Sequence, residues 1–293
     1  MIAARLRRPF SGSGVLPTIA AGLLSALAVA AVIVPALVSE EATAIGDVLS
    51  LRLLEPGSLD AGGRFHLLGT DRFGRDIFVR MMLAARVSLL VGIAGSVLAG
   101  ALGIAVGAAA GWRGGTLDRL TMSMSDALLA VPRLVLLLVC AALWQPGIGM
   151  VVTVLVLTGW MGVARLVRAE VLGVRSQAYV EAARALGVPA LRLLARHVLP
   201  NTLGSATVAI TLGVGSAILL ESGLSFLGLG IQPPAPSWGN MISDGRDAIV
   251  TAPWVALAPG LALIVTVLAS TILGDALRDH LAGEVVIGLG DRA

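Results

Sequence analysis

The stretch VSLLVGIAGSVLAGALGIAVGAAAGW, residues 87–112, contains no charged side chain. A helix needs about 20 apolar residues to cross the hydrocarbon core of a bilayer, so this stretch predicts a membrane-spanning helix. Four further stretches are equally free of charge: 14–38, 134–164, 197–220 and 248–274. Their lengths predict an all-α protein that crosses a membrane several times.

The composition of the whole chain supports the same class. Of 293 residues, 57% are hydrophobic and 13% are charged, and that charged share is about half the usual value for a soluble domain. No water-soluble fold can bury so much apolar surface. The net charge is only +3 and no run of basic residues exceeds two, which argues against a nucleic-acid partner.

Turn residues set the number of crossings. The stretch 134–164 is too long for one helix and contains Gln145-Pro146-Gly147, a turn signal. We therefore expect one crossing over 120–144 and another over 148–164, which makes six. Residues 222–243 are also free of charge, but half of them are Gly, Pro or Ser. A lipid-facing backbone with so many helix breakers would leave peptide groups unpaired, so we expect a structured, at most re-entrant, loop there.

The chain offers little material for catalysis or metal binding. Its one cysteine, Cys140, excludes an internal disulfide and a thiolate metal site. The three histidines are far apart in the sequence, so we expect no metal site. An intramembrane enzyme would need a nucleophile with a base, or metal ligands, within the helices, and only His197 lies at the end of a crossing.

The arginines predict the orientation. Arg5, Arg7 and Arg8 precede the first apolar stretch and resemble the start of a signal peptide, but that stretch is too long for one. With the N-terminus inside, thirteen arginines fall in cytoplasmic segments and seven in external segments. By the positive-inside rule, both termini are expected to be cytoplasmic.

The first long loop, residues 39–86, is then outside. Asp71 and Arg75 are four residues apart, as are Asp76 and Arg80, and on a helix each pair would meet. We therefore expect a short amphipathic helix over 65–84 on the membrane surface. It is either a solvated helix start or a docking surface for an external partner.

The second long loop, residues 165–200, is inside. Ala, Leu, Arg and Glu make 178–186 strongly helical. Gly187 suits the left-handed residue that ends a helix, and Pro189 can begin another. We expect two short helices that meet at this corner and face a cytoplasmic partner. The alternative is an ordinary basic connector.

This loop resembles the EAA loop of ABC importer permeases, through Glu181-Ala182-Ala183, Gly187 and Leu199-Pro200. The form of the loop, with His197-Val198 where the broad consensus has isoleucine, is similar to the peptide and nickel branch. Leu67 departs from that branch, which has His-Pro before Leu-Gly-Thr-Asp. Further motifs similar to this branch are Gly69-Thr70-Asp71, Gly74-Arg75-Asp76, 85–89, 224–230, 232–239 and 273–279.

The resemblance covers residues 64–282 and implies the type I ABC importer permease fold, here as the second, C-type subunit. It implies a permease core over 64–282, preceded by 1–63 with the first crossing and followed by a tail over 283–293. The implied partners are a homologous B-type permease, two cytoplasmic ATPases and an external binding protein, in a bacterial cell membrane. The implied ATPase-coupling residues are Tyr179, Glu181, Ala182, Ala183, Arg184, Gly187 and Pro189.

The resemblance also implies a transport subunit rather than an enzyme. The chain has no lysine and so cannot form the phosphate-binding loop that ends in Gly-Lys-Ser/Thr. ATP and magnesium are therefore expected on partner subunits, with no cofactor on this chain. Peptides are the default cargo of the branch, and nickel chelates, glutathione and haem stay open.

Two groups of residues carry further expectations. Possible docking residues for the binding protein are Asp71, Arg75, Asp76, Trp238 and Arg246, with capping of the bundle as the alternative; Trp238 is expected to anchor at the membrane interface.

Asp126, Arg133 and Glu221 are either gate residues or polar pairs between helices. Asp126 and Arg133, seven apart, are expected on one face of one helix. An ion-coupled secondary transporter would show mid-membrane polar ligands and often an internal repeat, and no repeat is seen.

Overall fold

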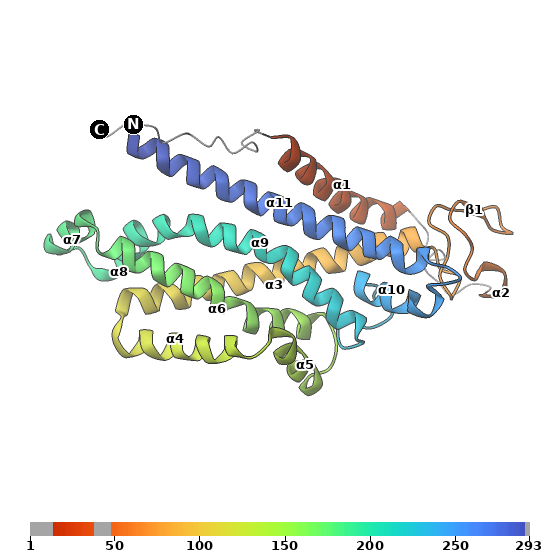
Figure 1. Ribbon diagram of the computed structural model, residues 1–293, viewed down its shortest axis with the longest axis horizontal. Coiled ribbons are helices and arrows are strands. Elements are labelled where there is room, and N and C mark those ends of the chain that lie inside the picture. The colour runs from red at the N-terminus through yellow and green to blue at the C-terminus, as the bar shows by residue number, and fades with distance from the viewer. Residues whose placement is uncertain (1–13, 38–47, 291–293) are drawn as a thin grey trace, which may run out of the picture.

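The computed structural model describes residues 14–37 and 48–290 (Figure 1). The basic residues of 1–13, part of the first outer loop and residues 291–293 lie outside the described residues. The longer elements are α1 (Val15–Leu37), α3 (Ile77–Arg113), α4 (Gly115–Ala130), α5 (Arg133–Leu143), α6 (Ile148–Arg175), α9 (Leu199–Phe226) and α11 (Trp254–Gly290). The shorter ones are α2 (Val48–Leu51), β1 (Ser58–Leu59), β2 (Phe65–His66), α7 (Ala178–Ala185), α8 (Ala190–Leu193), the π-turn η2 (Leu194–Val198), α10 (Trp238–Gly245) and the 3₁₀ turn η3 (Arg246–Ala248).

Among the described residues, five helical spans are long and apolar enough to cross a membrane: Val15–Leu37, Ile77–Arg113, Ile148–Arg175, Ala190–Phe226 and Trp254–Leu281. The fourth includes α8, η2 and α9, which follow one another without a break. Helices α4 and α5 pass the same test only as a bent pair, which is either one broken span or a re-entrant loop. The predicted six crossings agree with this number when the bent pair is counted as one.

The third predicted crossing is not a single helix. Helices α4 and α5 meet at an angle of 91°, with Val131 (φ −86°, ψ 129°) and Pro132 (φ −53°, ψ 127°) between them in non-helical conformations. A residue before proline is pushed out of the α region, which explains the break at this point. The expectation that Asp126 and Arg133 share one helix face is therefore wrong.

Helix α3 is the centre of the bundle and packs along α6, with α9 and α1 also against it. Small residues let α3 and α6 approach closely. A Cβ added to Gly103 would lie 2.7 Å from the Trp160 carbonyl oxygen, and one added to Gly107 would lie 2.3 Å from that of Ala164. The stripe of small residues therefore sets the distance between the two helices.

Helix α1 lies against α3 and α11 (Figure 1). Pro35 has no backbone N–H, so the carbonyl of Ala31 loses its helical partner. The Arg86 side chain of α3 donates from Nε to this carbonyl and from Nη2 to that of Val32, at 2.6 Å for the latter. One arginine thus satisfies the backbone that the proline leaves unpaired.

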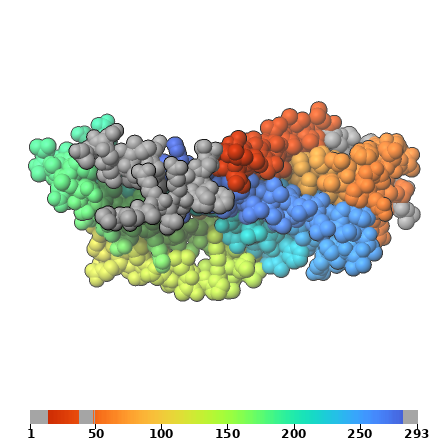
Figure 2. Space-filling view, turned by 45° about the horizontal axis from the view of Figure 1, so that its top comes forward, coloured from red at the N-terminus to blue at the C-terminus, as the bar shows by residue number. Residues whose placement is uncertain are grey.

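The two ends of the bundle carry different structures (Figure 1). Helices α7 and α8 lie at one end, and β1, β2, α2 and α10 lie at the other. In Figure 2 the orange surface from the segment before α3 meets the blue surface of α10 and the start of α11 at this second end. Strands β1 and β2 pair antiparallel, with Ser58 opposite His66.

The predicted amphipathic helix over 65–84 is wrong in its first half. Residues 65–76 form β2, tight turns and a bridge between Thr70 and Asp76, and α3 begins at Ile77. Gly69 and Gly74 have φ of +73° and +75°, and such residues interrupt a helix. A Cβ at Gly69 would lie 2.2 Å from the Leu54 carbonyl oxygen, so a close approach also requires glycine there.

Residues 222–243 do not form a crossing, as predicted. Helix α9 continues to Phe226, and the chain then runs irregularly to Ser237 before α10. Helix α10 packs on α9 and α11, with Trp238 and Met241 in a buried cluster that also contains Ile77 of α3. The short helix α10 was not predicted.

Candidate functional site

The candidate coupling loop, residues 176–189, joins α6 to α8 and protrudes at one end of the bundle (Figure 1). It is shorter than the predicted 165–200 because α6 continues to Arg175 and α8 begins at Ala190. Two of its large side chains are exposed, Tyr179 by 48% and Leu186 by 85%, whereas Val180 is buried; Leu191 just after the loop is 77% exposed. An exposed apolar patch of this kind is typical of a protein–protein contact.

The corner of this loop has the predicted geometry. Gly187 has φ +83°, and the N–H groups of Gly187 and Val188 donate to the carbonyls of Arg184 and Ala183, at 3.0 and 3.2 Å. No atom of the described residues lies within 4 Å of a Cβ placed on Gly187, so glycine is required by the backbone conformation and not by space. Pro189 immediately precedes α8 with φ −56°.

The other coupling residues lie on α7. Glu181 and Ala182 are exposed and Ala183 is half-buried. The guanidinium carbon of Arg184 lies 5.5 Å from the centre of the Trp112 ring, at the end of α3. The Tyr179 hydroxyl accepts a hydrogen bond from Asn201 at 3.3 Å. Helix α7 is thus connected to both α3 and α9 through side chains.

Ion pairs connect the neighbouring helices near this end. Arg168 of α6 binds Asp118 of α4 through two hydrogen bonds of 2.5 and 2.6 Å. Arg165 pairs with Asp126. Asp126 is therefore an interhelical partner of α6, with its side chain 63% exposed, and it lies on a different helix from Arg133.

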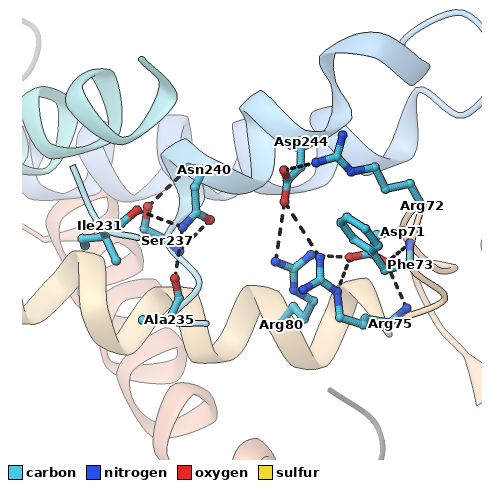
Figure 3. Close-up of polar contacts among 10 residues, drawn as sticks. All are labelled: Asp71, Arg72, Phe73, Arg75, Arg80, Ile231, Ala235, Ser237, Asn240 and Asp244. Carbon is cyan, nitrogen blue, oxygen red and sulfur yellow. Dashed lines mark hydrogen bonds and ion pairs between the residues drawn. The ribbon is translucent and has the colours of Figure 1, made fainter. Parts of the chain in front are cut away.

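A charge cluster occupies the opposite end (Figure 3). Asp71 is 1% exposed and accepts hydrogen bonds from the backbone of Phe73 and Arg75, at 2.8 and 3.0 Å, from Arg75 Nε at 2.8 Å, and from Arg80. Asp244 of α10 lies 2.9 Å from Arg72, 3.9 Å from Arg75 and 3.8 Å from Arg80. The cluster therefore holds α10 against the start of α3.

The predicted pairs are only partly present in this cluster. Asp71 and Arg75 do pair, although no helix brings them together. Asp76 does not pair with Arg80: its carboxylate accepts from the Val79 N–H at 3.0 Å as the N-cap of α3, and it contacts His66 Nδ1 at 2.7 Å. Asp76 is a helix cap and not a surface charge.

Burial separates the docking candidates. Trp238 is 0% exposed and its indole N–H donates to the Met81 carbonyl at 3.3 Å, so the expected interfacial ring is wrong. Asp71 and Asp76 are also buried, and the Arg75 side chain is 15% exposed. Arg246 alone among the five is open, with its side chain 71% exposed and 3.4 Å from Asp247.

Asn240 fixes the loop before α10 (Figure 3). Its side-chain oxygen accepts from the Ser237 N–H at 2.9 Å, and the Ser237 hydroxyl accepts from the Asn240 N–H at 3.3 Å. The Asn240 amide also donates to the carbonyls of Ala235 and Ile231, at 3.1 and 3.4 Å. The sequence analysis did not predict this cap, although the spacing Ser237-x-x-Asn240 is a signal that could have revealed it.

Glu221 lies buried between α9 and α3 and is 0% exposed. It accepts hydrogen bonds from Ser225 at 2.7 Å and from Ser88 of α3 at 2.9 Å, and Ser222 lies 3.3 Å away. These contacts place Glu221 in an interhelical polar network. Arg133 instead lines a cavity between α3, α6 and α9.

Comparisons with known proteins agree with this architecture. Residues 103–286 match the family described as "Binding-protein-dependent transport system inner membrane component". The oligopeptide transport system permease protein OppC of Bacillus subtilis (strain 168) is 41% identical over 216 residues, 74% of this chain and 71% of that protein. The dipeptide transport system permease protein DppC of the same organism is 40% identical over 217 residues, 74% of this chain and 68% of that protein. A putative peptide permease protein of Brucella suis biovar 1 (strain 1330) is 44% identical over 216 residues, 73% and 72% of the two chains.

Proposed function

The chain belongs to the family of inner membrane components of binding-protein-dependent transport systems. We propose that it forms half of the translocation path that carries di- and oligopeptides across the membrane. The chain is a multi-pass permease subunit of an ABC importer, and such a subunit works with partner ATPases and a binding protein. Peptides are proposed as the cargo because about three-quarters of the chain is similar to oligopeptide, dipeptide and peptide permeases.

The coupling loop is proposed as the contact for a cytoplasmic ATPase. Its support is the exposed apolar surface of Tyr179 and Leu186 on a corner that Gly187 holds in one conformation. Two ATPases, one for this loop and one for the loop of a homologous B-type permease, complete the proposed complex. ATP and magnesium bind to those subunits.

The orientation follows from this assignment. The end with α7 faces the cytoplasm together with both termini, and the end with α10 faces the binding protein. The arginine distribution supports this direction through the positive-inside rule. The exposed Arg246 beside the charge cluster supports a docking surface for the binding protein at the outer end.

The test is reconstitution of the permease pair, both ATPases and the binding protein in liposomes. Labelled di- and tripeptides should accumulate only when ATP and all five subunits are present. Competition with nickel chelates, glutathione and haem in the same assay ranks the other cargoes of the branch. Ion-driven uptake by this chain alone would overturn the proposal in favour of a secondary transporter.

A further inference from the structure

A cavity of about 130 Å³ lies between α3, α6 and α9, and Arg133 at the start of α5 lines it. Its walls come from the middle of each helix, since Gly95 is the central residue of Ile77–Arg113 and Ala209 is next to the centre of Ala190–Phe226. Small residues form much of the wall: Ser96, Gly100, Gly159, Gly213 and Ser216. The cavity therefore lies at mid-depth in the membrane-spanning bundle.

Arg133 is a cation without an acidic partner at this depth. Its Nε donates to the Thr158 hydroxyl at 3.2 Å, and within residues 14–37 and 48–290 no carboxylate forms an ion pair with it. The nearby arginines differ, because Arg165 and Arg168 of α6 each have an aspartate. A charge inside a bilayer is costly and marks a functional site unless it is paired.

The local backbone adds to the positive potential. Arg133 is the first residue of α5, where the helix dipole favours an anion and disfavours a cation. The nearest buried acid along α9, Glu221, is already bound to Ser88 and Ser225. The part of the chain that the structure describes thus leaves this positive charge uncompensated.

The lack of a side chain at Gly159 leaves space beside the Arg133 guanidinium. A Cβ added to Gly159 would lie 3.3 Å from Arg133 Nη2 and 2.9 Å from the Ala99 Cβ. Ser216 lines the same cavity, is exposed, and its hydroxyl has no hydrogen-bond partner among the described residues. A guanidinium and a free hydroxyl are the donors that a carboxylate requires.

We propose that Arg133, with Ser216, binds the C-terminal carboxylate of a peptide in transit. This inference rests on the proposed peptide cargo and names the part of the peptide that the path recognises. The cavity is smaller than the roughly 300 Å³ at which whole small-molecule pockets begin, so it holds the carboxylate end while the rest of the peptide stays in the path. Recognition of the main-chain carboxylate is independent of the side chains.

The experiment compares two peptides in the reconstituted five-subunit complex. One is a labelled trialanine with a free carboxylate, and the other is the same peptide with a C-terminal amide, each at a concentration that saturates the binding protein. Arg133→Gln should lower uptake of the free acid about tenfold, the effect of losing one charged hydrogen bond, and leave uptake of the amide within about twofold. Arg133→Lys should retain most of the uptake of the free acid.

The control is Arg119→Gln, which removes an exposed arginine from α4 and should change neither uptake. Equal loss of both peptides in Arg133→Gln, or no loss of either, would overturn the inference. If Arg133→Gln fails to assemble, Ser216→Ala replaces it and should reduce uptake of the free acid alone. Absence of uptake of both peptides by the wild-type complex would instead refute the peptide cargo itself.

Discussion

Gly187 shows how one residue can matter through its backbone alone. Its φ of +83° is a conformation that a β-branched residue avoids, although no described residue would contact an added Cβ within 4 Å. The left-handed conformation costs an ordinary residue about 1–2 kcal/mol. A substitution there should therefore change the shape of the loop without changing the packing of the bundle.

Gly187→Val should insert into the membrane normally and abolish ATP-dependent uptake. Gly173→Val is the matched control, because Gly173 is an exposed helical position of α6 and no atom in the described part of the chain lies within 4 Å of an added Cβ. Transport and co-purification of the ATPases are measured for both variants. Normal transport by the Gly187 variant would show that the corner has no coupling role.

Glu221 is expected to act through stability. Glu221→Ala leaves the buried hydroxyls of Ser88 and Ser225 without their acceptor, and each such loss costs about 1–3 kcal/mol. The melting temperature of the purified complex should fall, and Glu221→Gln, which keeps an acceptor oxygen, should lower it less. An unchanged melting temperature with altered transport would favour a gate.

At the scale of the element, much of the fold could be predicted. Uncharged apolar stretches gave the positions of α1, α3, α6, α9 and α11, and Gln145-Pro146-Gly147 separated α5 from α6. The break before Pro132 was missed because membrane helices tolerate proline, so a single proline does not by itself divide a predicted crossing. Helix α10 was missed because its composition resembles that of a loop.

One of the two candidate sites could be predicted from the sequence and the other could not. The corner at Gly187 was predictable because it depends on residues close in sequence. The charge cluster was not, because Asp71 binds Arg80 and Asp244 lies far along the chain. Spacing alone suggested Asp76 with Arg80, but the turns at Gly69 and Gly74 bring other partners together.

The cluster leads to a prediction about α10. Asp244→Asn removes the negative charge that faces Arg72, Arg75 and Arg80. Because the Asp244 side chain is only 27% exposed, the change should lower the free energy of unfolding by about 1–2 kcal/mol. Amide hydrogen exchange of residues 238–245 should become faster. Asp247→Asn, which removes a surface charge, is the control and should leave exchange in α10 unchanged.

At the scale of the whole molecule, the outer end should meet the binding protein through exposed charge. Arg246 is the exposed one of the two arginines that were predicted to dock. Arg246→Glu reverses its charge. It should weaken the stimulation of ATPase activity by loaded binding protein, more at low salt than at high salt, while basal activity persists. Unchanged stimulation in a normally assembled complex would identify this surface as a cap of the bundle.

Helix α3 runs from the charge cluster at one end of the bundle to α7 at the other. Arg80, in the first turn of α3, contacts the charge cluster, and Trp112, in its last turn, contacts Arg184 of α7. At 1.5 Å per residue, the 37 residues of α3 span about 55 Å. A tilt of about 5° around the middle of such a lever displaces its two tips by roughly 2.4 Å in opposite directions. That displacement is enough to separate an arginine from its aspartate, so a small rotation at the α7 end reaches α10 without any bending of the helix.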